Sequence, residues 1–260
     1  MADPLVSCLM VTQQGRLEMF KHAVGDYLRQ TYPNRELVIV TSDAPAAMAP
    51  AFEFIRELGN PSIQFHQLAH LDGKQQPLGA MRNATNDLAA GTLCCTWDDD
   101  DRHHPDRLKT HYDTIVAQKV DGSYLNEQLH FFPQDQALYW TDWRQRRSPG
   151  ILLYRRSPVR YPVEGERAHR GEDTDFITKL CSSGQKIVKV AGGGQLYLRY
   201  FHGKNTWHYA HHLHVAKSGS LNGEQLTTRR HVIAQTLKLF QVPGPVHVRD
   251  RTRIVFTYNG

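Results

Sequence analysis

The stretch GTLCCTWDDDD, residues 91–101, joins a short apolar run to four consecutive aspartates. Residues Thr92 to Trp97 are bounded by glycine on one side and by charge on the other, which predicts a buried β-strand. A helix is predicted from Pro105 to about Gln118, because proline suits the first helical position. The aspartates are therefore expected at the carboxyl end of a buried strand, shortly before a helix.

Strands and helices alternate on the N-terminal side of this stretch. Strands are predicted at Leu5 to Thr12, Glu36 to Thr41 and Ile63 to Leu68, and helices at Arg16 to Gln30, Ala46 to Leu58 and Leu78 to Ala90. This alternation predicts an α/β fold with a Rossmann-like, mostly parallel central sheet that is flanked by helices. Ligands bind such sheets at the carboxyl ends of the strands, which here carry Thr12, Asp43 and the run Asp98 to Asp101.

The pattern becomes less regular beyond Asp121. Short strands are predicted at Gln128 to Phe132, Ala137 to Thr141, Ile151 to Arg155, Lys186 to Val190 and Leu196 to Phe201, with a helix at Asp173 to Ser182. No linker rich in Pro, Gly and Ser separates this half, so it is expected to be a smaller mixed lobe packed on the first. Residues 216–260 are expected to add a helix, Gly223 to Phe240, and an alternating stretch, Val246 to Tyr258.

Composition limits the classes of protein to which the chain can belong. Its 260 residues are 40% hydrophobic and 22% charged, which is ordinary for a globular protein and argues against disorder. A membrane helix needs roughly 18 consecutive apolar residues, and the sequence has no such run. The four cysteines lack metal-ligand spacing and are interpreted as buried thiols of a reducing compartment, so we expect a cytoplasmic protein. The net charge of +5 favours anionic partners such as nucleotide phosphates, nucleic acid or a membrane surface.

The four aspartates repel one another and need relief. Like charges about 4 Å apart cost about 1 kcal/mol per pair in water and more in a partly dry site. A divalent cation, a nearby arginine or full exposure to solvent would supply that relief, and Mg²⁺ or Mn²⁺ prefers one or two carboxylates plus phosphate oxygens. Alternate residues can have different roles, with Asp98 facing a ribose or a cation and Asp100 holding the metal. An acidic loop that caps the next helix is the alternative.

Three further groups of residues are candidates for catalysis or ligand binding. Glu172 and Asp173 lie in the acidic sequence GEDTDF, where a carboxylate can act as a general base or simply favour the start of a helix. His208 and His212 would share one face of a helix, interpreted as solvated or facing an acceptor. Aromatic rings stack on sugars and arginines clamp phosphates, so an acceptor site is hypothesised near Trp140 and Trp143. This last region also contains Tyr139, Arg144, Arg146 and Arg147.

These motifs together resemble glycosyltransferase family 2, a large group of inverting enzymes with the GT-A fold. The matching pieces are PLVSCLMVT (4–12), LRQTYPNRELVIV (28–40), LGAMRNATNDLAAGTLCCTWDDDDRHHPDRL (78–108), GEDTDF (171–176) and RYFHGKNTW (199–207). They occur in the family's own order and cover the chain from Pro4 to Trp207. The resemblance implies a GT-A domain of residues 1–215, with a nucleotide-sugar-binding lobe (4–110), an acceptor and catalytic lobe (111–215), and an extension (216–260).

The resemblance also implies roles for individual residues. The donor would contact Thr12 and Asp43 through its base, and Arg82, Asn83, Asp98 and Asp99 through its ribose or phosphates. Asp98 and Asp100 occupy the family's DXD positions and would hold Mn²⁺ or Mg²⁺, with His202 as a further metal ligand or a phosphate contact. Asp173 matches the position of the catalytic base, with Glu172 beside it. One departure is the sequence Ser42-Asp43-Ala44-Pro45, where many relatives have Asp-Asp-Gly or Asp-Gly-Ser, so the identity of the base stays open.

The expected activity is metal-dependent, inverting transfer of a sugar from a nucleotide-diphosphate sugar, most often a UDP-sugar, to an acceptor hydroxyl. The acceptor would be a saccharide or a lipid-linked molecule of surface polysaccharide or glycoconjugate synthesis, and the basic surface allows a peripheral position at the inner face of a membrane. A nucleic-acid partner is not expected. Two alternatives stay open: a Mg²⁺-dependent nucleotidyltransferase or phosphohydrolase, and a non-catalytic protein of the same fold that binds glycan or nucleic acid.

Overall fold

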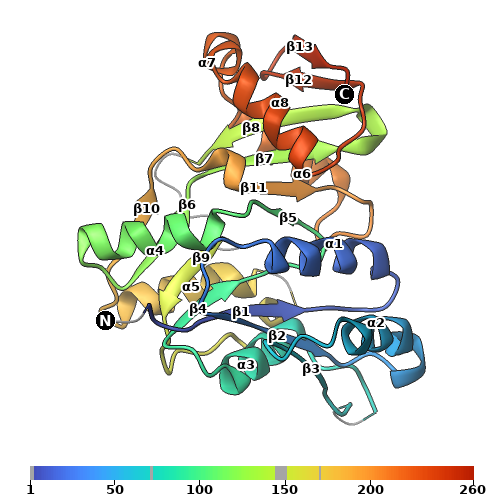
Figure 1. The fold of residues 1–260 in the computed structure, drawn as a ribbon, viewed down its shortest axis with the longest axis vertical. Coiled ribbons are helices and arrows are strands. Elements are labelled where there is room, and N and C mark those ends of the chain that lie inside the picture. The colour runs from blue at the N-terminus through green and yellow to red at the C-terminus, as the bar shows by residue number, and fades with distance from the viewer. Residues whose placement is uncertain (1–2, 71–72, 144–150, 170) are drawn as a thin grey trace.

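A seven-stranded sheet forms the centre of the computed structural model, which describes residues 3–70, 73–143, 151–169 and 171–260 (Figure 1). Its strand order is β10-β6-β9-β4-β1-β2-β3. The strands are β1 (Val6–Val11), β2 (Arg35–Thr41), β3 (Ile63–Gln67), β4 (Leu93–Thr96), β6 (Gly122–Leu125), β9 (Leu152–Arg155) and β10 (Ile187–Val190). All neighbours are parallel except β9, which runs antiparallel to β4 and to β6. The predicted mostly parallel α/β sheet is confirmed.

Helices cover both faces of this first sheet, because its strands carry apolar side chains on both faces. The helices are α1 (Leu17–Leu28), α2 (Pro45–Leu58), α3 (Leu78–Leu88), α4 (Arg107–Gln118) and α5 (Glu172–Ser182). Cys8 and Met10 of β1 pack with residues of α1, α2 and α4. Leu9, between them, belongs to the opposite core with Phe176 and Leu180 of α5. This burial on both faces explains why the central strands β1, β2 and β4 are largely apolar in the sequence.

A close turn leads from α3 into β4, the strand that precedes the aspartates. A Cβ atom on Gly91 would lie 2.6 Å from the Leu5 carbonyl oxygen, so only glycine fits there. The backbone N–H of Gly91 donates to Ser7 Oγ at 2.9 Å, and Ser7 Oγ in turn donates to Glu36 Oε1 at 2.6 Å. These buried bonds satisfy the polar groups of the turn and fix the point where β4 enters the sheet.

A second sheet of six strands lies beyond the first, with the order β13-β12-β8-β7-β11-β5 (Figure 1). Its strands are β5 (Arg102–His103), β7 (Glu127–Phe132), β8 (Ala137–Asp142), β11 (Tyr197–Tyr200), β12 (Val246–Arg249) and β13 (Ile254–Tyr258). On one face, Leu129 and Leu138 pack against Ile233 and Leu237 of α8. On the other, Phe132 and Tyr139 pack against α6. The helices here are α6 (Tyr209–Ser218), α7 (Gly223–Thr228) and α8 (Arg230–Leu239).

The structure departs from the predicted elements in several places. The predicted helix from Gly223 to Phe240 is two helices, because Arg229 ends α7 and begins α8. Strands β5 and β6 were not predicted, since runs of two and four residues are too short to show a period. Short 3₁₀ turns, η1 (Pro133–Asp135), η2 (Glu166–Ala168) and η3 (Gly194–Leu196), join other elements. None of the helices in the described residues has the length and apolar composition needed to cross a membrane.

The two sheets draw on all parts of the chain. Strands β6, β9 and β10 follow residue 110 and extend the first sheet beyond β4. Residues 216–260 contribute α7, α8, β12 and β13 to the second sheet and its core. The division of the chain at residues 110 and 215 stays a prediction.

Candidate active site

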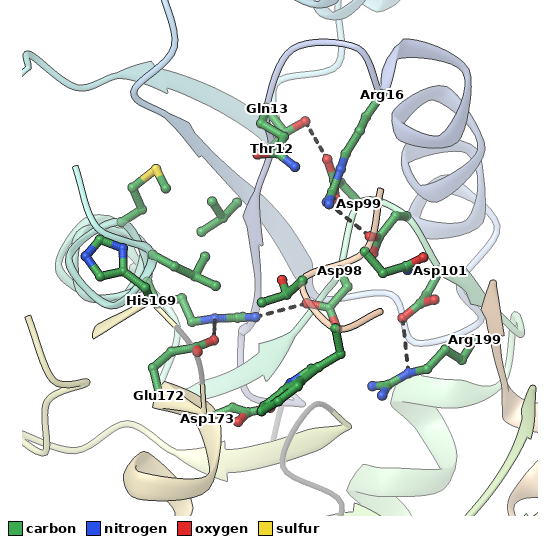
Figure 2. Close-up of a pocket in the computed structure, with 18 of the residues that line it drawn as sticks. Thr12, Gln13, Arg16, Asp98, Asp99, Asp101, His169, Glu172, Asp173 and Arg199 are labelled. Atoms are coloured by element: carbon green, nitrogen blue, oxygen red, sulfur yellow. Dashed lines mark hydrogen bonds and ion pairs between the residues drawn. The ribbon is translucent and has the colours of Figure 1, made fainter. Parts of the chain in front are cut away.

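A cleft of about 310 Å³ lies at the carboxyl ends of β1 and β4, where the two sheets meet (Figure 2). The chain passes from β4 of the first sheet to β5 of the second through Asp98 to Asp101, so the aspartates form part of the junction. The described residues that line the cleft are Val11, Thr12, Gln13, Arg16, Leu78, Met81, Arg82, Asp98 to Asp101, His169, Gly171, Glu172, Asp173, Arg199, Asn205, Thr206, Trp207 and His212.

The four aspartates have alternating surroundings. The side chains of Asp98 and Asp100 are 19% and 14% exposed, whereas those of Asp99 and Asp101 are 2% and 5% exposed. Asp99 accepts a hydrogen bond from Thr12 Oγ1 at 2.7 Å. Asp101 accepts one from the backbone N–H of Tyr200 at 2.9 Å and another from the Tyr197 hydroxyl. The chain itself therefore holds the buried pair, while Asp98 and Asp100 are more accessible from the cleft.

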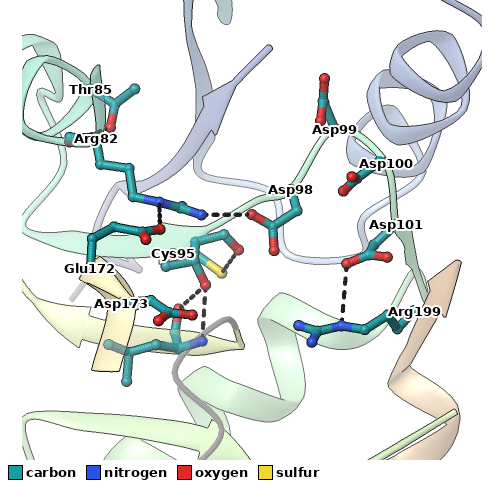
Figure 3. A network of polar contacts seen from close by, with 12 residues as sticks. Arg82, Thr85, Cys95, Asp98, Asp99, Asp100, Asp101, Glu172, Asp173 and Arg199 are labelled. Carbon is teal, nitrogen blue, oxygen red and sulfur yellow. Dashed lines mark hydrogen bonds and ion pairs between the residues drawn. The ribbon is translucent and has the colours of Figure 1, made fainter. Parts of the chain in front are cut away.

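Three arginines balance the negative charge. Arg82 lies between two carboxylates, with Nη2 3.3 Å from Asp98 and Nε 3.1 Å from Glu172 (Figure 3). Arg16 Nη1 lies 2.8 Å from Asp99 and 3.0 Å from Asp100. Arg199 approaches Asp101 to 3.9 Å. The relief expected from a nearby arginine is thus present, and three cationic side chains border the same cleft.

Burial and neighbouring charges separate the pKa values of these carboxyl groups. Burial raises the pKa of Asp99 to about 6, against the opposing charge of Arg16. Burial and the charge of Asp100 raise the pKa of Asp101 to about 8. Burial also opposes ionisation of Asp100, but the hydrogen bond from His202 and the charge of Arg16 outweigh it and lower its pKa. Of Asp99, Asp100 and Asp101, Asp100 is therefore the one that most firmly keeps its negative charge.

His202 contacts the accessible aspartate from the segment that follows β11. Its Nε2 lies 3.0 Å from Asp100 Oδ2, and its Nδ1 accepts a hydrogen bond from the backbone N–H of Lys204 at 3.3 Å. A ring that accepts at Nδ1 donates from Nε2, so His202 holds the Asp100 carboxylate in place here. His202 as a ligand of a metal ion stays a prediction.

The carboxylates that border the cleft can be compared with the ligands that the expected divalent cation prefers. Across the residues that the structure describes, no group of three or more His, Cys, Asp or Glu side chains is arranged to hold a metal ion. Asp98 and Asp100 nevertheless both border the cleft. Mg²⁺ commonly binds through one or two carboxylates together with substrate phosphates rather than in a protein cage. These two carboxylates fit a cation that is shared with a diphosphate.

The start of α5 brings a second acidic pair to the cleft. Glu172 is buried beside Arg82, and burial raises its pKa although Arg82 opposes the change. Asp173 is half-buried in the cleft wall, and its Oδ1 accepts a hydrogen bond from the backbone N–H of Thr174 at 2.6 Å. Asp175 instead pairs with Lys179 at 2.7 Å and does not line the described cleft. The acidic start of α5 thus divides into two groups with different surroundings.

Two residues predicted at the donor site lie outside the described lining of the cleft. The Asp43 carboxylate is buried and accepts hydrogen bonds from the Gln14 backbone N–H and from Gln75 Nε2. Asn83 makes two hydrogen bonds to the backbone of Tyr161, at 3.0 and 2.9 Å. These contacts tie loops to the first sheet and to α3, so both side chains help to hold the walls of the site. Contact of Asp43 or Asn83 with a donor stays a prediction.

Neither of the two predicted acceptor tryptophans is among the described residues that line the cleft. Trp140 is 2% exposed in the core of the second sheet, where its Nε1 donates to Glu127 Oε2 at 2.7 Å. The Trp143 ring lies 6.4 Å from that of His130. Arg144, Arg146 and Arg147 fall outside the described residues. The structure instead places Trp207 in the cleft wall, 38% exposed and stacked on His211 with ring centroids 4.5 Å apart.

Sequence reasoning missed Arg16, Arg199 and Trp207 as cleft residues. Arg16 follows the loop after β1, and β1 and β4 lie side by side in the sheet. Its place in the sequence could therefore have indicated that it lies near the aspartates that follow β4. Arg199 lies on β11, whose place beside β5 and β7 depends on long-range pairing. Trp207 lies in the irregular segment between β11 and α6, where no periodic pattern indicates direction.

The fold is similar to that of solved glycosyltransferases. TarS 1–349 of S. aureus in complex with UDP-GlcNAc matches with a TM-score of 0.59 and 14% identity, over 90% of this chain and 66% of that one. Mannosyltransferase PcManGT from Pyrobaculum calidifontis, in complex with GDP-Man and Mn²⁺, matches with a TM-score of 0.57 and 12% identity, over 92% and 74%. The chain thus spans just under two thirds of TarS 1–349, and 43% of a longer TarS chain.

These structural neighbours agree with the α/β architecture, and at such low identity they show the fold alone. No protein-family model and no curated protein sequence matches the chain.

Proposed function

We propose that this protein is a metal-dependent, inverting glycosyltransferase that moves a sugar from a nucleotide-diphosphate sugar to an acceptor hydroxyl. The observation that carries the proposal is the meeting of Asp98 and Asp100, three arginines and Asp173 in one cleft at the carboxyl ends of β1 and β4. Ligands of open α/β sheets bind at this edge. The nucleotide sugars bound by TarS and PcManGT support the same class of donor.

The charged half of the cleft suits the diphosphate of the donor. Arg16 and Arg82 border it as cations that are paired to carboxylates. Asp98 and Asp100 would hold Mn²⁺ or Mg²⁺, which supplies positive charge to the leaving diphosphate. Thr12 and Asp99 form the wall beside this position. A UDP-sugar is the donor that we propose first, with the base read by the loops around Asp43.

Asp173 is the proposed general base. As the acceptor oxygen attacks the anomeric carbon, the bond from that carbon to the diphosphate breaks and the hydroxyl proton passes to a carboxylate oxygen of Asp173. A single displacement of this kind inverts the configuration at the anomeric carbon. Glu172 is buried against Arg82, so it positions the arginine and adds negative charge beside the base.

The acceptor is proposed to enter on the side of the cleft that carries Trp207 and His212. Trp207 offers an exposed indole, and His212 has a pKa lowered to about 4 by burial and by the charge of Arg199, so its imidazole is neutral at physiological pH. Aromatic faces and neutral hydrogen-bonding groups suit the hydroxylated ring of a saccharide. Surface polysaccharide or glycoconjugate synthesis, on a saccharide or lipid-linked acceptor at a cytoplasmic membrane face, is the setting that we propose.

Product analysis tests the proposed reaction. The protein is incubated with Mn²⁺ and UDP-sugars, and then with GDP-, dTDP- and CDP-sugars, and the released nucleotide is measured. A parallel reaction contains a nucleoside triphosphate and a sugar 1-phosphate instead, and its pyrophosphate is measured. Transfer or slow hydrolysis of the nucleotide sugar releases the nucleoside diphosphate, whereas a nucleotidyltransferase releases pyrophosphate from the triphosphate. Release of pyrophosphate in the parallel reaction, without release of nucleoside diphosphate from any nucleotide sugar, would favour that alternative.

The base assignment is tested by substituting Asp173. Asp173→Asn is expected to lower turnover about 100-fold or more, the usual contribution of a general base, while nucleotide affinity stays near that of the wild type. Asp175→Asn is the matched control, because Asp175 lies on the same helix and pairs with Lys179 outside the cleft. Equal losses in the two variants would contradict the assignment of Asp173.

A further inference from the structure

Arg16 occupies a specific place beside the acidic run. It follows Gly15, whose φ of 78° turns the chain after β1, and it immediately precedes α1. Its Nη1 lies 2.8 Å from Asp99 Oδ1 (Figure 2) and 3.0 Å from Asp100 Oδ2. One guanidinium nitrogen therefore bridges the buried Asp99 and the more accessible Asp100.

This arginine is also held in its position by a residue of its own loop and by the segment that follows β11. Gln13, with its amide oxygen turned toward the guanidinium, accepts hydrogen bonds from Nη2 at 2.8 Å and from Nε at 2.9 Å. The Lys204 carbonyl oxygen accepts another from Nη2 at 3.3 Å. The side chain of Arg16 is 12% exposed. A charged group buried to this extent needs such partners, so its position is a built feature of the site.

Arg16 and Arg82 both contact carboxylates that a cation would use. Each has a second carboxylate partner, Asp99 for Arg16 and Glu172 for Arg82, which it keeps if Asp100 or Asp98 turns to a cation. Arg16 lies 3.0 Å from the Asp100 oxygen that also accepts from His202. A divalent cation on Asp100 would meet the positive charge of Arg16 at short range and be strongly repelled. Arg16 and the cation therefore compete for Asp100.

We propose that Arg16 is the counter-ion of Asp99 and Asp100 in the nucleotide-free protein, and that it transfers to the donor's diphosphate when a divalent cation takes Asp100. This inference rests on the proposed function, because it assumes a diphosphate in the cleft. Arginine suits the second position as well as the first, since its planar fork binds phosphate and carboxylate oxygens alike. The cation and the nucleoside diphosphate then bind cooperatively. The cation frees Arg16 from Asp100, and the diphosphate gives the displaced arginine a new negative partner.

The test measures the two affinities separately in the full chain. Free Mn²⁺ is titrated by electron paramagnetic resonance without nucleotide, and UDP is titrated by calorimetry at saturating Mn²⁺. In Arg16→Gln, Mn²⁺ alone is expected to bind about tenfold more tightly because a competing positive charge is gone. UDP with Mn²⁺ is expected to bind about tenfold more weakly because a charge-assisted contact is lost. Arg16→Met, a second neutral variant that keeps the length of the side chain, is expected to match.

Two controls separate charge from folding. Arg16→Lys keeps the positive charge, so its affinity for Mn²⁺ alone should stay near that of the wild type while UDP binds more weakly. Arg56→Gln removes an exposed arginine that pairs with Glu53, and both affinities should be unchanged. Thermal melting of each variant confirms that the folded protein is being titrated.

The outcomes distinguish this inference from the proposed function. If the wild type binds UDP in a Mn²⁺-dependent way but Mn²⁺ alone binds equally to the wild type and to both neutral variants, competition by Arg16 is refuted and the donor site stands. If UDP affinity is unchanged in those variants, Arg16 does not transfer to the diphosphate. If the wild type binds no nucleoside diphosphate with any cation, the proposed function and this inference fall together.

Discussion

Neighbouring aspartates in the run Asp98 to Asp101 have different chemical environments although their sequence is uniform. The run lies in the turn between β4 and β5, where Asp99 and Asp101 are the buried pair. Asp101 is enclosed by Tyr197 and the Tyr200 backbone, where burial raises its pKa to about 8. Asp100 meets His202 and Arg16, and its pKa is lowered. The protein thus combines carboxyl groups of high and low proton affinity within one short segment.

The raised pKa of Asp101 predicts a specific effect of pH on stability. A carboxyl whose pKa is higher in the folded than in the unfolded protein stabilises the fold at low pH, and this contribution is lost as pH rises from about 4 to about 8. The difference in unfolding free energy between the wild type and Asp101→Asn should therefore shift against the wild type over this range, as measured by urea unfolding. Asp113→Asn, at an exposed position, is the control. A difference that is constant with pH would contradict the raised pKa.

Part of the candidate site is readable at the level of single residues. The position of the aspartates follows from their place directly after a buried strand, and that of Asp173 from the start of a predicted helix. Asp43 also lies at a strand end, but its direction depends on Gln14 and Gln75, which only the folded chain brings to it. The contacts of Asn83 with Tyr161 join residues 78 positions apart and leave no local pattern.

At the scale of elements, the first sheet was predictable except for β6, and the second was predictable only in pieces. The central strands β1, β2 and β4 are largely apolar because helices cover both faces of the sheet. Strand β5 has two residues, and it joins a sheet whose other strands come from distant parts of the chain. Pairing of β8 with β12 likewise links residues about a hundred positions apart, which periodicity does not report.

The surroundings of two tryptophans predict opposite effects of their removal. Trp140 is buried in the core of the second sheet, with the Arg229 guanidinium 5.4 Å from its ring. Trp140→Ala is therefore expected to lower the unfolding free energy by about 3–5 kcal/mol, the usual cost of truncating a buried aromatic residue. Trp207→Ala, at a more exposed position in the cleft, is expected to change it by about 0.5 kcal/mol or less and to weaken use of the acceptor.

Urea unfolding and assays of transfer at varied acceptor concentration measure these two effects. Donor affinity in Trp207→Ala serves as the internal control, since the proposed donor contacts lie on the charged half of the cleft. A stable Trp140→Ala protein with a selective loss of acceptor use would restore the original hypothesis for that residue.

At the scale of the whole molecule, the cleft depends on how the two sheets are joined. Arg102 of β5 pairs with the fully buried Asp26 of α1, with Nε 2.8 Å from its carboxylate. The same side chain donates to the Phe240 carbonyl oxygen at 2.6 Å. One arginine therefore connects the first layer of helices, the second sheet and the segment after α8. Removing a partner of such a buried pair leaves an uncompensated charge, so the arrangement favours a fixed geometry directly beside the aspartates.

The last segment of the chain has a structural role that the sequence did not reveal. Val246 and Val248 of β12 lie in the core of the second sheet with Leu138 and Ile233. This sheet also contains β11, which supplies Arg199 and Tyr197 to the aspartate cluster. The segment 216–260 therefore supports one wall of the cleft through the sheet, and none of its residues is among those that line the described cleft.

The measurement that tests the central claim most directly is calorimetric titration with UDP, with and without Mn²⁺, of the wild type and of Asp100→Ala. The claim is that Asp100 and a divalent cation together bind the diphosphate of the donor. It predicts binding by the wild type that requires Mn²⁺ and is abolished in Asp100→Ala. GDP, dTDP or CDP binding in the same metal-dependent way would keep the site and change the donor. Binding to none of these nucleotides with any cation, or equal binding by Asp100→Ala, would contradict the claim.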